Sequence, residues 1–222
     1  EAAKLTTSGE GSPVIYSTGN IIVNNVNGIA NNSEIGVVEG KNSITLTNSN
    51  VTGYKDNGFM LYQSFSGDAE NGIARLKAEN NTLTTHATGA FLYVNNTTAE
   101  VDLSNNAISM PNTSTLVKAA ADSRWGKTGE NGGHLTLRTS NQELSGNIMA
   151  DSISTIALDM TNGSSLVGAV NTDNTAKEVT VKLSKDSNWI LTGDSYVKSL
   201  NNEDTTGSNI HSNGYKLVVA EK

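Results

Sequence analysis

The sequence predicts an all-β fold, a parallel β-solenoid of about seven coils. Three observations lead to this prediction. Short stretches of alternating apolar residues recur, segments rich in Asn, Ser and Gly separate them, and no helical periodicity lies between them. Six equivalent apolar points follow one another at steps that average about 28 residues. These points are Val26, Val51, Leu83, Ile108, Leu144 and Leu166.

A first column of strands is expected where alternating apolar residues precede a polar corner. The stretches are SITLTNSNVTG, AEVDLSNNAIS, GHLTLRTSNQELSG, STIALDMTNGSSLVG and KEVTVKLSKDSNWILTG. In a strand, every second side chain points to the same face, so each stretch supplies one inward pair. The expected inward pairs are Ile44/Leu46, Val101/Leu103, Leu135/Leu137, Ile156/Leu158 and Val179/Val181.

A second column of strands is expected at a set of shorter apolar stretches that alternate with the first along the chain. They are VIYST, IGVVEG, FMLYQS, FLYVNN, LVKAAA, IMADS, AVNTD and SYVKS. The corners between strands need residues that tolerate left-handed backbone angles, as Asn and Gly do. We therefore expect stacked asparagine ladders at the Asn runs Asn24-Asn25, Asn80-Asn81, Asn95-Asn96 and Asn105-Asn106.

The composition suits a single domain with a thin core. Of 222 residues, 36% are hydrophobic and 5% aromatic, so a narrow solenoid core is easier to fill than a large globular one. We assign residues 1–222 to one β-helix domain, with a polar lead-in at 1–11 and a last coil or edge strand at 201–222. The chain has no cysteine, so it has neither a disulfide nor a thiolate metal site.

The charge and hydropathy of the chain exclude two classes of partner. The formal net charge is −7, whereas a nucleic-acid-binding protein needs basic patches that neutralise phosphates. No apolar run approaches the roughly 20 residues that span a bilayer, so we expect no membrane insertion in this segment.

Four phrases in the sequence resemble a known group of proteins. They are GSPVIYSTGNIIV, VVEGKNSITLTNSNVTG, MLYQSFSGDAE and DSRWG. With these, residues from about 11 to about 200 resemble bacterial extracellular right-handed β-helix proteins of the adhesin-like or autotransporter-passenger-like kind. The resemblance implies a right-handed parallel β-helix that is secreted or attached to the cell surface. It supplies no catalytic residue and no cofactor.

Two long loops indicate a candidate ligand-binding site. Residues 64–72 and 120–133 are expected to leave the same corner two coils apart, so their bases lie about 10 Å from each other. Between them Trp125 offers a flat face for a sugar ring, and charged side chains offer hydrogen bonds to hydroxyls or carboxylates. The predicted ligand-binding residues are Asp68, Glu70, Arg124, Trp125, Lys127 and Glu130.

The loop residues also have a purely structural interpretation. In it Trp125 folds back over apolar side chains as a lid, and Arg124 pairs with Asp122 or Asp68. A calcium ion held by Asp68 and Glu70 is a further alternative, although no calcium-loop spacing is present. His86, His134 and His211 are far apart in the sequence and have no metal-ligand spacing. We expect no metal site.

Outward positions of the first column bear on an enzymatic function. Arg75, Asp102, Arg138 and Asp159 are expected on successive coils, where a polysaccharide lyase would keep its acids and base. Opposite charges that alternate down a strand ladder more simply maintain coil register and solubility.

The sequence thus predicts a non-enzymatic adhesion or structural module of the bacterial surface, with a host or environmental glycan as partner. A polysaccharide-active enzyme, lyase-like or hydrolase-like, is the first alternative. The second alternative is a subunit of an extracellular fibre that self-associates end to end through its coil edges.

Overall fold

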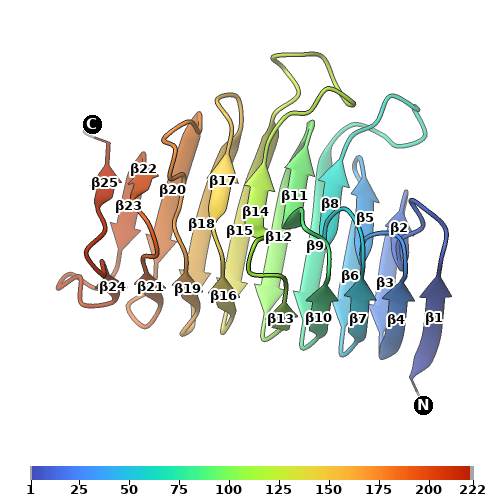
Figure 1. The fold of residues 1–222 in the computed structure, drawn as a ribbon, viewed down its shortest axis with the longest axis horizontal. Coiled ribbons are helices and arrows are strands. Elements are labelled where there is room, and N and C mark those ends of the chain that lie inside the picture. Colours follow the sequence, from blue (N-terminus) through green and yellow to red (C-terminus); the bar gives the residue numbers. More distant parts are fainter. Residues whose placement is uncertain (1, 221–222) are drawn as a thin grey trace.

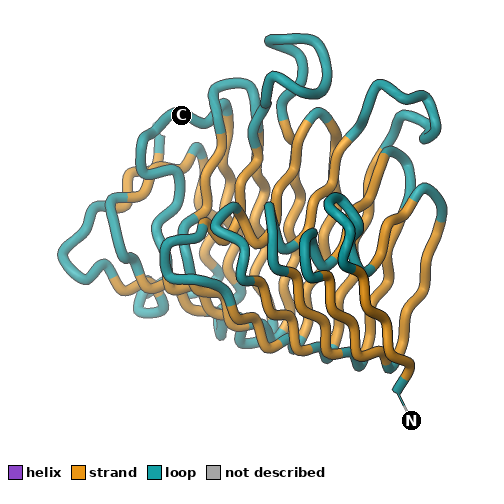
Figure 2. The backbone as a smooth tube through the Cα atoms, turned by 45° about the vertical axis from the view of Figure 1, so that its right-hand side comes forward, coloured by secondary structure: helices purple, strands orange, loops and turns teal. Residues whose placement is uncertain are grey.

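The computed structural model describes residues 2–220 and is a β-solenoid of stacked coils (Figure 1). Its strands pair in parallel throughout, and no helix occurs between residues 2 and 220. The predicted all-β solenoid is confirmed. As Figure 2 shows, the strands of successive coils stack side by side while loops project from the corners.

Three faces, here called faces 1, 2 and 3, follow one another along each coil. Face 1 has a five-stranded sheet followed by a four-stranded sheet within the described range. The five strands are β1 (Ala3–Thr7), β4 (Val26–Ala30), β7 (Asn50–Gly53), β10 (Thr82–Thr85) and β13 (Ala107–Ser109). The four strands are β16 (Glu143–Ser145), β19 (Ser165–Val167), β21 (Asn188–Ile190) and β24 (Ile210–His211).

Face 2 has a six-stranded sheet and then a two-stranded sheet within residues 2–220. The six strands are β2 (Ile15–Ser17), β5 (Gly36–Glu39), β8 (Phe59–Tyr62), β11 (Ala90–Asn95), β14 (Thr115–Ala119) and β17 (Ile148–Ala150). The last two are β22 (Ser195–Val197) and β25 (Leu217–Val219). All of these strands except β25 correspond to predicted stretches of the second column. The predicted stretch AVNTD forms no strand and contributes only an isolated bridge at Val170.

Face 3 is one continuous sheet of eight strands in the described part of the chain. They are β3 (Asn20–Asn24), β6 (Ser43–Thr47), β9 (Ile73–Glu79), β12 (Thr97–Ser104), β15 (Gly133–Ser140), β18 (Thr155–Thr161), β20 (Glu178–Leu183) and β23 (Ser199–Asn202). Face 1 has nine strands between residues 2 and 220, so the solenoid has about nine turns, close to the predicted seven. The difference arises because β1 and β24 lack the alternating inward residues used to count coils.

The core is a narrow column of aliphatic side chains between the three faces. All five predicted inward pairs of face 3 are buried, with at most 3% of any side chain exposed. One expected equivalence is wrong: Val51 aligns with Gly28, not with Val26. A Cβ atom on Gly28 would lie 2.5 Å from Cγ1 of Val14, so Val14 occupies the space that an inward side chain would fill.

Asparagines form two ladders at the corner between faces 3 and 1. In the outer ladder, Asn80 and Asn105 adopt positive φ, and Nδ2 of Asn105 donates to Oδ1 of Asn80 over 2.7 Å. In the buried inner ladder, Nδ2 of Asn81 donates to Oδ1 of Asn106 over 2.8 Å, and Nδ2 of Asn106 donates to Oε1 of Gln142 over 3.0 Å. The predicted ladders are confirmed at these two runs, whereas Asn95 and Asn96 lie at the corner between faces 2 and 3.

Charged residues alternate down the outer side of face 3. The register places five of them in one row: Lys77, Asp102, Arg138, Asp159 and Lys182. Arg75 belongs to the neighbouring row, where its Nε atom lies 3.2 Å from Glu100. Opposite charges on adjacent strands disfavour a shift of coil register, as expected for a stabilising ladder.

Candidate functional site

Two long loops leave the corner between faces 2 and 3, as expected from the sequence. One joins β8 to β9 and the other joins β14 to β15, and both project at the top of Figure 1. The loops touch, because the ring centroids of Phe65 and Trp125 are 6.1 Å apart. They therefore form one continuous surface two coils wide rather than two separate walls.

Trp125 is the centre of this contact. Its ring lies 5.3 Å from that of Tyr62 at the end of β8, and the guanidinium of Arg124 lies 4.8 Å above it. Oδ1 of Asp122 accepts the backbone N–H groups of Arg124 and Trp125, which positions both side chains. The indole is half-buried, and its Nε1 atom is buried without a hydrogen-bond partner among the described residues.

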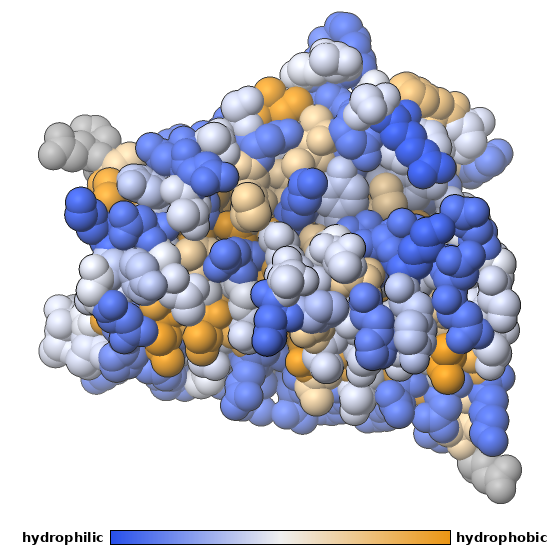
Figure 3. Space-filling view, in the orientation of Figure 1, coloured by the Kyte–Doolittle hydropathy of each residue, from blue (hydrophilic) through white to orange (hydrophobic). Residues whose placement is uncertain are grey.

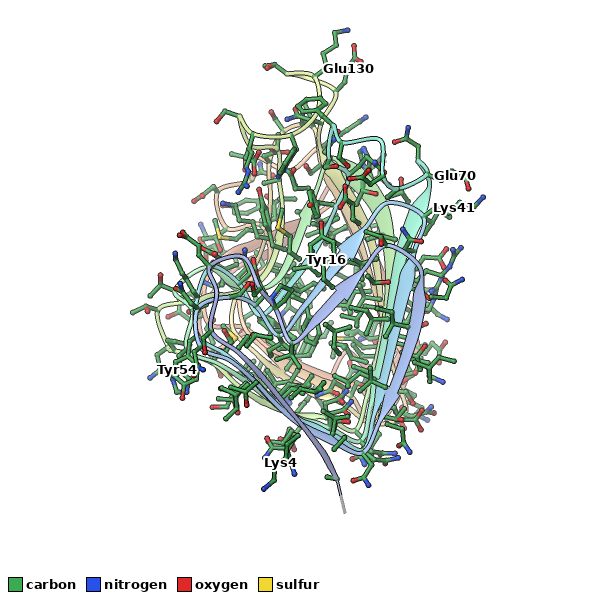
Figure 4. All side chains as sticks on the ribbon, turned by 90° about the vertical axis from the view of Figure 1, so that its right-hand side faces the viewer. Lys4, Tyr16, Lys41, Tyr54, Glu70 and Glu130 are labelled. Carbon is green, nitrogen blue, oxygen red and sulfur yellow. The ribbon has the colours of Figure 1, made fainter. Side chains whose placement is uncertain are left out.

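The other predicted site residues lie apart from this stack. Glu70 forms an ion pair with Lys41 over 3.0 Å, and Figure 4 shows both on the right of the end-on view, away from Tyr16. Lys127 pairs with Glu130 over 2.5 Å, and Glu130 lies at the tip of the uppermost loop (Figure 4). Asp68 is exposed, and its backbone N–H donates to Ser66 Oγ. The structure thus brings Arg124 and Trp125 together but leaves the other four at the rim.

A buried carboxylate beside the stack was not predicted from the sequence. Glu39 is 4% exposed and accepts hydrogen bonds from four hydroxyls. Tyr16 donates to it over 2.5 Å, Ser66 over 3.2 Å and Tyr62 over 3.4 Å, and Ser64 is the fourth donor. Burial opposes ionisation, but these donors outweigh it and lower the pKa of Glu39. The carboxylate is therefore held charged, although no Lys or Arg among residues 2–220 forms an ion pair with it.

The signal that identifies Glu39 is its position in the second column. It ends the expected strand in IGVVEG, and Tyr62 holds the same position in FMLYQS, so the register pairs them. Two neighbouring polar residues at the ends of stacked strands indicate a shared hydrogen-bond network. The hydroxyls of Ser64 and Ser66 come from the loop, and sequence spacing alone does not place them.

The outer side of face 2 carries a small cavity near the beginning of its strands. It has a volume of about 250 Å³ and is lined by Asn57, Thr88, Gly89, Ala90, Tyr93, Thr115 and Lys118. The ammonium of Lys118 lies 5.5 Å from the centre of the Tyr93 ring. The Tyr93 hydroxyl donates to Oδ2 of Asp122 over 3.1 Å, which links the cavity to the Trp125 loop.

Burial raises the pKa of the Tyr93 hydroxyl, and the neighbouring Asp122 carboxylate raises it further. The hydroxyl is therefore a neutral hydrogen-bond donor at physiological pH. Gly89 keeps this cavity compact, because a Cβ atom there would lie 2.1 Å from the carbonyl oxygen of Asp56.

Together these features form a single elongated surface, here called the face 2 surface. One register row along it contains Tyr16, Val37, Met60, Tyr93, Lys118 and Met149. In Figure 3, apolar and weakly polar atoms gather below the loop at the top of the view. The surface combines aromatic rings with carboxylate, amide and hydroxyl groups, which is the chemistry of hydrogen-bonded recognition of polyhydroxylated ligands.

The described residues hold no group of three or more His, Asp or Glu side chains that would bind a metal ion. Asp68 and Glu70, the residues of the calcium alternative, are both exposed, and Glu70 is paired with Lys41. Between residues 2 and 220, no helix is long and apolar enough to cross a membrane.

Comparison with protein-family models, with curated proteins and with solved structures finds no match to this chain.

Proposed function

We propose that this chain is an extracellular glycan-binding module of the adhesin-like β-helix kind, displayed on or secreted from a bacterial cell. The observation that carries the proposal is the aromatic stack of Tyr62, Phe65 and Trp125 across the two loops. Phe65 is 69% exposed, although it touches a half-buried tryptophan. An aromatic ring kept in solvent beside others offers a stacking platform for the apolar face of a sugar.

The polar groups beside the stack support the same ligand class. Tyr16 is 43% exposed, and its hydroxyl contacts both Glu39 and the Tyr62 hydroxyl. Arg124 extends the charged part of the surface above Trp125. A sugar seated on the rings would exchange hydrogen bonds with these groups, which are held in place before the ligand arrives.

A glycan array tests the proposal with four purified proteins: the wild type, Phe65→Ala, Trp125→Ala and Tyr54→Ala. Tyr54 is a matched control, because it is 47% exposed and stacks on His86 at the corner between faces 1 and 2 (Figure 4). We expect the wild type and Tyr54→Ala to bind the same glycans, and both loop variants to lose that binding. Equal binding by Phe65→Ala and the wild type would refute the assignment to this surface.

A second candidate function rests on the two ends of the described solenoid. Strands β1, β2 and β3 are outermost in their sheets at one end, as are β23, β24 and β25 at the other. Their unpaired edges can extend each sheet by a further coil, supplied by a second copy or by another segment of a longer chain. Light scattering over a range of concentrations tests self-association, and a mass that stays monomeric at millimolar protein would exclude a fibre subunit.

A further inference from the structure

Face 1 is interrupted between β13 and β16. These strands are neighbours in the lower row of Figure 1, yet β13 is the last strand of the first sheet and β16 is the first strand of the next. At the other coil steps nearby, the first strand residue donates its N–H to a corner carbonyl of the adjacent coil. Thr82 donates to Ser49, Ala107 to Asn81 and Ser165 to Gln142 over 2.8–2.9 Å.

The step from Asn106 to Gln142 breaks this pattern. Here the Asn106 carbonyl accepts the side-chain Nε2 of Gln142 over 2.8 Å, in place of the Glu143 backbone N–H. A glutamine side chain is one methylene longer than the asparagines that occupy the ladder before it. The Gln142 side chain therefore bridges a wider gap between the two coils. Beyond it, β13 and β16 are not paired with each other.

The coils also change length at this step. The segment between the inner ladder and face 2 runs from Asn106 to Val117 in one coil and from Gln142 to Ile148 in the next. It is therefore five residues shorter in the second coil. Gly146 permits the short path, because it adopts a φ of 125° and a Cβ atom there would lie 3.1 Å from Cβ of Leu116. The wider coil therefore overhangs the narrower one.

Beneath the overhang lies an open cavity with a volume of about 710 Å³, which we call the ledge. Its lining includes Ile108, Met110, Pro111, Glu143, Ser145 and Val167. The edge of β13 forms one wall, and the outer sides of β16 and β19 form the floor. Val167 is 38% exposed on that floor.

The backbone of β13 is oriented for pairing at the ledge. The N–H of Ala107 donates to Asn81 in the preceding coil. Because successive residues of a parallel strand pair with opposite neighbours, the N–H and C=O of Ile108 point towards the ledge. No strand pairs with that edge among residues 2–220.

We propose that the ledge binds an extended peptide of a partner protein, which adds a strand to β13 and lies across β16 and β19. This mode of recognition combines main-chain hydrogen bonds with pockets for alternate side chains. Met110, Pro111 and Val167 supply an apolar pocket for one aliphatic side chain. Glu143 is the only charged residue of the lining and makes no ion pair among the described residues, so the peptide carries a basic residue opposite it.

The test begins with a random heptapeptide display library, selected on the purified 222-residue chain. Peptides that are enriched are then synthesised in three forms: unmodified, and N-methylated at either of the two alternating sets of residues. N-methylation removes donors along one edge of a strand and preserves every side chain. We expect one methylated form to bind at least about tenfold more weakly and the other to bind like the unmodified peptide.

Two protein variants locate the peptide. Glu143→Gln is expected to weaken binding about threefold, as for a partly exposed ion pair, whereas Glu130→Gln at the loop tip leaves it unchanged. Amide NMR signals of Ile108 and Ser145 are expected to shift on binding. The proposal is overturned if no peptide is enriched, if both methylated forms bind equally, or if the shifts map outside the ledge.

Discussion

Replacement of Asn106 by alanine tests the contribution of the buried amide ladder to the solenoid. Asn106 is 6% exposed, and its side chain makes four hydrogen bonds. Nδ2 donates to the Ala78 carbonyl and to Gln142, while Oδ1 accepts both the backbone N–H and the Nδ2 of Asn81. At about 1 kcal/mol of net stability for each bond, the variant loses about 4 kcal/mol of unfolding free energy.

Asn105→Gly is the matched control one residue away. Asn105 has a φ of 52°, which glycine adopts without strain, and its side-chain bonds to Asn80 and Asn141 are exposed. We expect it to cost less than about 1 kcal/mol. Urea unfolding followed by circular dichroism measures both variants, with hydrogen exchange to show whether the loss spreads to neighbouring coils. Equal losses for Asn105→Gly and Asn106→Ala would refute the role given to the inner ladder.

Three further predictions concern single side chains. Trp189→Ala costs about 3–5 kcal/mol in urea unfolding, because the indole is fully buried and its Nε1 donates to the Gly168 carbonyl over 3.0 Å. Trp125→Ala changes that free energy by less than about 1 kcal/mol but speeds proteolysis within residues 120–133, since its contact with Tyr62 holds the loop rather than the core. Glu34→Gln gains thermal stability relative to the wild type as pH rises from about 4 to about 7.5, because burial raises the pKa of Glu34.

The sign of the Glu34 effect follows from proton linkage. The folded carboxyl holds its proton to higher pH than the unfolded one, so the folded state is progressively destabilised as pH rises above the unfolded pKa near 4.5. Glutamine removes this dependence. A stability difference between Glu34→Gln and the wild type that is constant with pH would contradict this prediction. The Trp189 prediction fails if Trp189→Ala is as stable as the wild type, and the Trp125 prediction fails if the Trp125→Ala loop is cleaved at the wild-type rate.

The face 3 strands could be predicted because their information is local. Ile44 and Leu46, or Val179 and Val181, are two residues apart, and alternation along a strand directs both to the same side. The same alternation led to a wrong equivalence at Val26. A side chain from elsewhere, Val14, fills the inward position at Gly28, and periodicity within a strand does not reveal that.

The candidate site could be predicted only in part. Loop length and composition indicated the corner that carries Trp125 and Arg124, but not that Trp125 lies on Tyr62. Glu39 receives its hydroxyl donors from two other coils and a loop, at sequence separations of 23 to 27 residues. Which polar residues meet across such sequence separations depends on the length of every turn between them.

The sequence by itself therefore determined the architecture of this protein. Alternating aliphatic residues and corner asparagines act through backbone geometry that each strand and turn expresses locally. Tertiary structure decided the features that distinguish one coil from the next: the Trp125 stack, the charged Glu39 among hydroxyls, and the ledge opened by Gln142. Each of these arises from contacts between coils, whose spacing and register are set only when the coils have stacked.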